Sequence, residues 1–337
     1  MTSPRTSRTA PATASPQEAP SAKHAATARR AGRAANVGGV TPNPNFDVTP
    51  NPRAVAQLVP DRELVEELYH DQDAELDREA ESAADLFLPA GADAAWLEEL
   101  AAACAERAST YAFLARIYQV EVDQPLLDQL VDTRYPASTG IDEVDQGNLQ
   151  LATYLSNVWE NTVTELAIDY VRAFIGHNGN HISAAYPFES VYRSEKQLLM
   201  QEARDEVLAL YRAAGLTKQE SWGDGEDHVA LELEYMRVLA DRSAEVLAEA
   251  AQAQAESPEN WADPADETGA FMRATRLLRA QRNFMRYHLG AWVPAFTREV
   301  ERFAQTDFYL GAAKVTRGFV TADAELLDEV LEQRADA

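Results

Sequence analysis

Apolar residues recur with a helical period from about residue 94 to near the end of the chain. The stretch 94–118 places Leu97, Leu100 and Tyr111 on one broad apolar stripe, which predicts a first long helix. The same pattern predicts further helices at 125–132, 149–175, 194–214, 225–252, 267–287, 294–304, 307–320 and 324–334. No stretch alternates with a period of two for long enough to indicate a sheet. The sequence therefore predicts an all-α fold.

Polar and turn-forming residues divide this pattern into regions. Residues 133–148 and 253–265 are polar and predict loops within the helical part. Residues 1–60 hold nine of the 16 prolines and a single aromatic residue, so they cannot bury enough apolar surface to fold and we expect them to be disordered. Residues 61–93 are strongly acidic and predict a helical extension. Residues 94–335 then form a single helical bundle.

The charge of the chain is distributed unevenly. The net charge is −25, but residues 1–60 alone carry seven basic and two acidic residues, so the remainder of the chain carries −30. A body this negative repels nucleic acid and anionic membranes and attracts a basic partner. An acidic surface that serves only for solvation, as in adaptation to salt, remains an open alternative.

Signals for export, membrane insertion and disulfide formation are weak. No apolar run reaches the roughly 18 residues of a membrane-spanning helix, and the first residues lack the apolar core of a secretory signal. The sequence 28–33, ARRAGR, contains paired arginines, but a polar, turn-rich stretch follows it. The single cysteine, Cys104, lies on a buried helix face and is expected to be inert. These features predict a cytoplasmic protein.

Candidate catalytic motifs are sparse. The chain contains no phosphate-binding loop, no dinucleotide fingerprint and no GxSxG or HExxH sequence. His177 and His181 have the spacing of metal ligands only within a helix, and the Asn-Gly-Asn between them indicates a loop instead. The sequence therefore predicts a protein that is not an enzyme and has no metal site.

Two short stretches carry residues that a structural role alone does not explain. In GDGEDHVALELEYM, residues 223–236, Asp224 can cap a helix, whereas Asp227 and His228 can either hold a neighbouring loop or line a site. In YPFESVY, residues 186–192, aromatic residues surround Pro187. They can pack a connector onto the bundle or form a surface that grips a peptide. The residues alone leave both interpretations open.

These stretches, together with two others, resemble the TorD/DmsD/NarJ family of redox-enzyme maturation chaperones. DYVRAFIG at 169–176 is similar to the helix of that family that ends in Gly, and YPFESVY resembles its Pro-aromatic-x-Ser-Val-Tyr loop. DGEDHVALELEYM resembles its Glu-Pro-x-Asp-His motif, with Asp224 and Gly225 in place of Glu-Pro. The stretch 283–320 contains HLGAWVPAF, which is similar to its C-terminal His-Leu-x-x-Trp-x-Pro-x-Phe pattern. The resemblance covers about 94–322.

The resemblance implies a bundle of the TorD/DmsD type and a cytoplasmic chaperone without catalytic activity. Its partner would be the catalytic subunit of a molybdopterin-containing oxidoreductase, of the dimethyl sulfoxide or trimethylamine N-oxide reductase type. The chaperone would bind the subunit's basic twin-arginine leader and its apoprotein until cofactor insertion. We expect the 186–192 loop and the start of the 225–252 helix to form facing walls of a groove, with Glu189 and Asp227 meeting arginines of the leader. The residues expected to bind the leader are Pro187, Phe188, Glu189, Ser190, Tyr192, Trp222, Asp227 and His228.

Other interpretations remain open at this point. A chaperone of the same fold can serve a nitrate-reductase-like subunit that is not exported, and a non-catalytic adaptor can share the acidic surface. An enzyme that uses His228 with Glu226 or Asp227 would lack a nucleophile and a metal set. Guanine-nucleotide or molybdopterin binding has no phosphate-cradling sequence to support it, so no cofactor is expected. Monomers and dimers are both compatible with the sequence.

Overall fold

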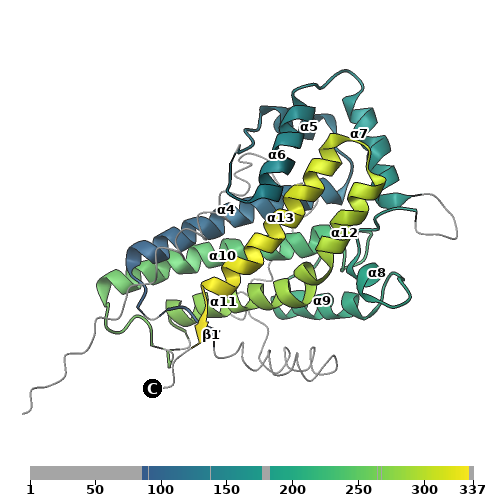
Figure 1. Cartoon of the computed structure of the whole chain (residues 1–337). Coiled ribbons are helices and arrows are strands. Elements are labelled where there is room, and N and C mark those ends of the chain that lie inside the picture. The colour runs from purple at the N-terminus through teal and green to yellow at the C-terminus, as the bar shows by residue number, and fades with distance from the viewer. Residues whose placement is uncertain are drawn as a thin grey trace, which may run out of the picture.

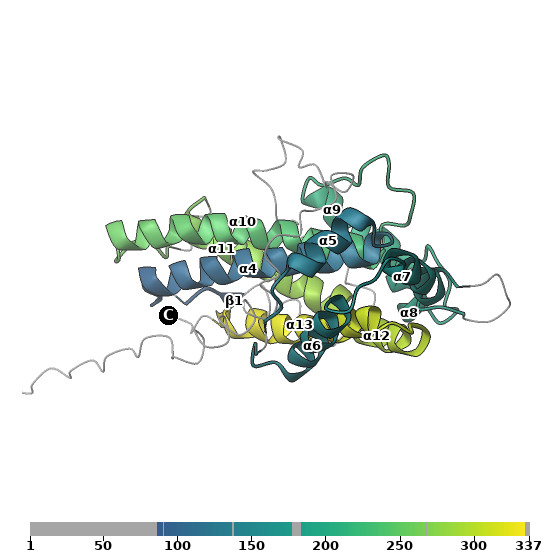
Figure 2. The same ribbon diagram turned by 90° about the horizontal axis from the view of Figure 1, so that it is seen from above.

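The computed structural model describes residues 86–89, 91–136, 138–176, 183–263, 265–266 and 268–333, and over these residues the fold is a helical bundle, as predicted. Long helices α4, α10 and α11 run side by side, and α13 crosses them towards α5, α6 and α7 (Figures 1 and 2). The α-helices are α4 (Ala94–Gln119), α5 (Gln124–Asp132), α6 (Asp142–Leu155), α7 (Thr162–Tyr170), α8 (Glu189–Arg193), α9 (Glu202–Ala213), α10 (Val229–Glu256), α11 (Ala270–Phe284), α12 (Gly290–Phe303) and α13 (Asp307–Glu329). Two π-helical segments, η2 (Val171–Ile175) and η3 (Met285–Leu289), continue α7 and α11.

The chain before α4 differs from the predicted acidic helical extension. Residues 61–85, like the expected disordered segment 1–60, lie outside the described residues. The described part is extended: β1 (Leu86–Phe87) pairs antiparallel with β2 (Glu332–Gln333), and Leu88 is buried in the core. The backbone N–H of Leu88 donates to Thr275 Oγ1 on α11. The packed body therefore begins before residue 94, and the helical prediction is wrong for residues 86–89.

Helix α6 occupies part of the stretch 133–148 that was predicted to be a loop. It begins at Asp142 and packs against α13 at a close backbone crossing. A Cβ added to Gly147 would lie 2.6 Å from the carbonyl oxygen of Gly311, so this approach requires the absence of a side chain. The polar residues that suggested a loop lie in the first turns, where Asp142, Glu143 and Asp145 complement the helix dipole.

Several other predicted boundaries are also wrong. The expected helix 149–175 is interrupted at 156–161, where the N–H of Trp159 donates to Thr162 Oγ1. Residues 194–201 are not helical, because Gln197 and Met200 have φ angles of 51° and 56°, in the left-handed region. Pro294 lies inside α12 rather than at its start, and the two predicted C-terminal helices form the single helix α13.

A buried ion pair joins α4 to α13. Arg107 on α4 and Asp323 on α13 are both fully buried and form a salt bridge, and the hydroxyl group of Tyr111 donates to Asp323 as well. Gln281 on α11 accepts a further bond from Arg107 at 2.8 Å. Each charged or polar group here satisfies another, which makes burial of the charges tolerable.

Replacing Asp323 with Ala should lower the free energy of unfolding by about 3–5 kcal/mol, because it leaves the Arg107 charge buried without its carboxylate. The matched control is Asp328→Ala on the same helix. Asp328 pairs with Arg282 but is more than half exposed, so its loss should cost less than about 1 kcal/mol. Urea unfolding of both variants measures the difference, and equal losses would contradict the proposed role of the buried pair.

Candidate functional site

The two stretches singled out in the sequence meet directly in the fold. Phe188 and His228 form an antiparallel β-bridge between the segment before α8 and the start of α10. The N–H of Glu189 donates to the carbonyl of Asp227, and the N–H of Val229 donates to the carbonyl of Pro187, both at 2.9 Å. We refer to 187–190 and 227–229 as the bridged segments. They fix the position of α8 relative to α10.

Asp227 strengthens this bridge with its side chain. Its Oδ2 accepts from the backbone N–H of Ser190 at 3.0 Å, which satisfies a donor in the first turn of α8. The carboxyl group is fully buried, and this burial raises its pKa above the ordinary value for Asp, although the bonds to Ser190 oppose the shift. Gly225 leaves room for it, since a Cβ there would lie 2.8 Å from Asp227 Oδ1.

His228 is the N-cap residue of α10, in place of the expected Asp224. Its Nδ1 accepts from the backbone N–H of Ala230 at 3.1 Å, so this nitrogen carries no proton and the ring is neutral. Burial lowers the pKa of His228 to about 3. The role of His228 that the structure shows is therefore to start the helix and hold the loop.

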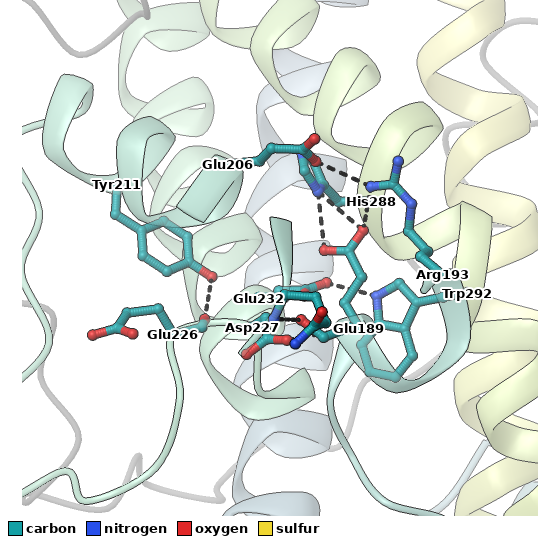
Figure 3. Close-up of polar contacts among 11 residues, drawn as sticks. Glu189, Arg193, Glu206, Tyr211, Glu226, Asp227, Glu232, His288 and Trp292 are labelled. Carbon is teal, nitrogen blue, oxygen red and sulfur yellow. Dashed lines mark hydrogen bonds and ion pairs between the residues drawn. The ribbon is translucent and has the colours of Figure 1, made fainter. Parts of the chain in front are cut away.

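A network of ionisable side chains extends from Glu189 of the bridged segments to neighbouring helices (Figure 3). Glu189 is fully buried, with its carboxylate oxygens 3.0 and 3.1 Å from His288 Nδ1 on η3. Arg193 donates to Glu189 at 2.8 Å and to Glu206 on α9 at 3.2 Å. Burial alone would raise the pKa of Glu189, but the attraction of His288 and Arg193 outweighs it and lowers the pKa. Glu189 is therefore ionised at neutral pH.

Glu232 on α10 is the neutral member of the same network. It is fully buried and accepts from Trp292 Nε1 on α12 at 2.9 Å. Burial, followed by repulsion from the charge of Glu189, raises its pKa well above the ordinary value for Glu. Of the two carboxyl groups, Glu189 therefore carries the negative charge, because it lies next to Arg193 and His288.

Glu226 anchors the other side of the loop before α10. Arg204 on α9 donates to its carboxylate at 2.6 Å, and Lys218 lies 2.8 Å from its other oxygen. Among the contacts that the described residues make, none joins His228 to the carboxylate of Glu226 or Asp227. The arrangement offers no acid–base pair of the kind that an enzyme using His228 would need.

Three half-buried aromatic side chains pack around His228 and Trp292. The rings of Phe188 and Trp222 meet the ring of His228 edge-on, at 5.0 and 5.2 Å between centroids. Tyr192 stacks on Trp292 at 5.4 Å. Phe188, Tyr192 and Trp222 are each half-buried, so they pack on His228 or Trp292 and still present part of their surface to solvent.

The structure brings the eight predicted site residues into one region, but not all of them at the surface. Glu189 and Asp227 were expected to meet arginines of a ligand, yet both are fully buried and bound by neighbours within the chain. That part of the expected groove is wrong for this conformation. Ser190 is also buried: its Oγ accepts from the N–H of Gln201.

Sequence reasoning missed the inner members of the network as site residues. His288 and Trp292 lie in the C-terminal pattern that carried the family resemblance, which was the available signal. Glu232 also lies in a stretch that carried the resemblance, 224–236, but it was passed over because an acidic residue in a helix ordinarily faces water. In the part of the chain that the structure describes, no group of three or more His, Cys, Asp or Glu side chains is placed to hold a metal ion. No helix among these residues is long and apolar enough to cross a bilayer.

The fold and the site define a helical protein with a partly exposed aromatic surface on a buried polar network. A family model described as the nitrate reductase delta subunit matches residues 141–298, which include both bridged segments and the network. The chain is 27% identical over 169 residues to the chaperone protein TorD of Vibrio cholerae, and 25% identical over 215 residues to that of Vibrio parahaemolyticus. These matches confirm the resemblance: residues 141–298 are similar to the family of molybdoenzyme maturation chaperones.

The matches cover part of each protein. The Vibrio cholerae alignment spans 50% of this chain and 65% of the relative, and the Vibrio parahaemolyticus alignment spans 64% and 80%. A TorD protein of Aliivibrio salmonicida, 22% identical, is matched over 99% of its length and 68% of this chain. No solved structure matches the chain.

The capping role of His228 predicts a specific loss of stability in acid. Its pKa is about 3 in the folded chain but about 6.5 when unfolded, so only the unfolded chain takes up a proton as the pH falls below the upper value. The stabilisation is complete above about pH 6.5 and is lost as the pH falls towards 3; between about pH 7 and pH 5 the loss is about 2 kcal/mol.

The variant His228→Asn should show a correspondingly smaller fall in unfolding free energy over this range, because an Asn oxygen can cap the helix and does not titrate. Urea unfolding at the two pH values measures it. If the variant loses as much stability as the parent protein, His228 is not held neutral in the fold.

Proposed function

We propose that the protein is a cytoplasmic, non-catalytic chaperone for the catalytic subunit of a molybdopterin-containing oxidoreductase. It binds the twin-arginine leader and the apoprotein of that subunit until the cofactor is inserted. The client is of the dimethyl sulfoxide or trimethylamine N-oxide reductase type. The similarity to proteins named chaperone protein TorD supports the class of function.

The observation that carries the proposal is the half-buried aromatic group above the bridged segments. Phe188, Tyr192 and Trp222 each keep one face in contact with buried residues and leave another open. Aromatic side chains of this kind contribute large contact area with little loss of conformational freedom. Because Glu189, Arg193 and His288 are bonded to one another within the chain, the segment that carries Phe188 and Tyr192 is held in place before a peptide arrives.

The negative charge of the chain favours a basic ligand through long-range attraction. The buried acids do not contact the ligand in this proposal. The chain after residue 60 carries a net charge of −30, whereas a twin-arginine leader is basic. Such complementarity raises the rate of encounter and weakens with salt. Exposed acidic side chains, and not Glu189 or Asp227, supply the attraction.

A second candidate follows from the family model. Its description as the nitrate reductase delta subunit favours an assembly chaperone for a nitrate-reductase-like subunit, which need carry no leader. The two candidates differ in the part of the client that is bound.

Calorimetric titration of the full chain with a twin-arginine leader peptide tests the proposal. The proposal predicts micromolar or tighter binding that weakens as salt is raised. It also predicts that Phe188→Ala weakens binding by about tenfold or more, since truncating a central aromatic anchor typically costs over 1 kcal/mol.

Phe87→Ala is the matched control, because Phe87 is also half-buried but lies in β1 at the far end of the molecule (Figure 1). Binding by this variant should be unchanged. Failure to bind the leader, with binding to the whole apo-subunit, would favour the nitrate-reductase-like candidate. Failure to bind either would contradict both.

A further inference from the structure

An apolar stripe lies exposed on the outer face of α7 and η2. Ile168, Val171 and Ile175 are 56%, 40% and 55% exposed. Their spacing of three and four residues places them along one side of the continuous helical segment. Ordinary helices in a soluble bundle put such residues in the core, so an outward stripe of three is a feature that needs a partner to cover it.

Trp159 extends this stripe into the turn between α6 and α7. It is 56% exposed, and it separates two hollows in the surface. The larger hollow, of about 600 Å³, is lined by Ile168 and Arg172 among others, and the smaller, of about 350 Å³, by Val131 and Val158. We refer to the exposed apolar side chains of these hollows, Val131, Val158, Trp159 and Ile168, together with Val171 and Ile175 of the stripe, as the Trp159 surface.

Acidic side chains border the Trp159 surface. Asp128 and Asp132 line the smaller hollow, and Glu165 and Asp307 line the larger. All four are exposed. The basic residue among the lining side chains is Arg172, whose charge is matched by Asp169 at 2.9 Å. The surface therefore combines apolar area with a net negative charge.

The backbone beneath this surface is held firmly. Asp169 is buried and accepts from the backbone N–H groups of Gln305 and Thr306, at 2.7–3.0 Å, which ties α7 to the start of α13. The bond from Trp159 N–H to Thr162 Oγ1 fixes the turn. A surface held in this way loses little conformational freedom when a ligand binds.

The Trp159 surface adjoins the bridged segments. The N–H of Ala185 donates to the carbonyl of Ala173 in η2 at 2.7 Å, so the residues just before Pro187 and Phe188 lie against the helix that carries the stripe.

Another exposed apolar segment gives a useful contrast. Leu198, Leu199 and Met200 are 51%, 49% and 66% exposed in the loop between α8 and α9. The adjacent charged residues, Glu195 and Lys196, cancel one another. This loop matches the Trp159 surface in apolar exposure but not in charge.

We propose that the Trp159 surface binds the apolar stretch of the client leader, while the four acids beside it bind the basic residues that flank this stretch. The inference rests on the proposed function and adds a contact surface that the bridged segments do not supply. An apolar surface bordered by acidic side chains is complementary to a peptide segment that is both apolar and basic. The same acidic side chains repel an anionic lipid surface. The neutral loop at 198–200 has no such complementarity.

The test uses the full chain and a synthetic twin-arginine leader peptide of a dimethyl sulfoxide reductase-type subunit. Trp159→Ala should weaken binding by about thirtyfold, the effect of truncating a central tryptophan anchor. Ile168→Ser should weaken it by about tenfold. The matched control Leu199→Ser, in the neutral loop, should change affinity less than about twofold. Circular dichroism confirms that each variant is folded.

A photo-crosslinking residue in place of Ile168 should attach to the apolar part of the leader, and one in place of Leu199 should not. Replacing Asp132 and Glu165 by Asn and Gln should reduce the salt dependence of binding.

If the parent protein binds the leader and the Trp159 and Ile168 variants bind it equally well, the inference is overturned and the proposed function stands. If the parent protein does not bind it, both fail. If Trp159→Ala instead dissociates a dimer of the parent protein, the surface is a contact between two copies and the inference is likewise overturned.

Discussion

The buried pair of carboxyl groups, Glu189 and Glu232, is the constraint on which the site depends. One is ionised because His288 and Arg193 attract its charge, and the other keeps its proton because it is buried next to that charge. Through Glu189, α8 is joined to η3, and through Glu232, α10 is joined to Trp292 on α12. These two carboxyl groups therefore join helical segments that are distant in the sequence. The aromatic surface rests on this junction, so its geometry is set before any ligand binds.

Much of the fold follows from apolar periodicity, whereas the details depend on contacts that the sequence does not display. The stripe on 94–118 predicts α4 closely, because burial of one helix face decides that structure. The first half of α6, residues 142–148, was assigned to a loop because the sequence does not display the glycine-mediated crossing with α13. Residues 194–201 were wrongly assigned to a helix because nothing in their composition signals the left-handed backbone at Gln197. Both errors arise where tertiary packing overrides local preference.

The candidate site was predictable in its location and less so in its chemistry. The resemblance identified the bridged segments, yet Glu189 and Asp227 face inward and act on the protein itself. An acidic side chain in a loop is usually exposed. Only the fold shows that Arg193 donates to Glu189 and that the backbone N–H of Ser190 donates to Asp227. Exposed acids on α5, α7 and α13 line the hollows beside Trp159, and no motif in the sequence marked them. Under the proposal above, the acids that hold the fold and the acids that meet the leader are separate sets.

The central claim is that a client leader covers two adjoining surfaces, the aromatic group above the bridged segments and the Trp159 surface. Hydrogen–deuterium exchange of the full chain, alone and saturated with the leader peptide, tests it most directly. The account predicts slower exchange in peptides covering 156–176 and 183–193, with no change in the first turns of α4 at the opposite end of the bundle. Saturating binding that leaves both segments unchanged, or that protects the 195–200 loop alone, would contradict it.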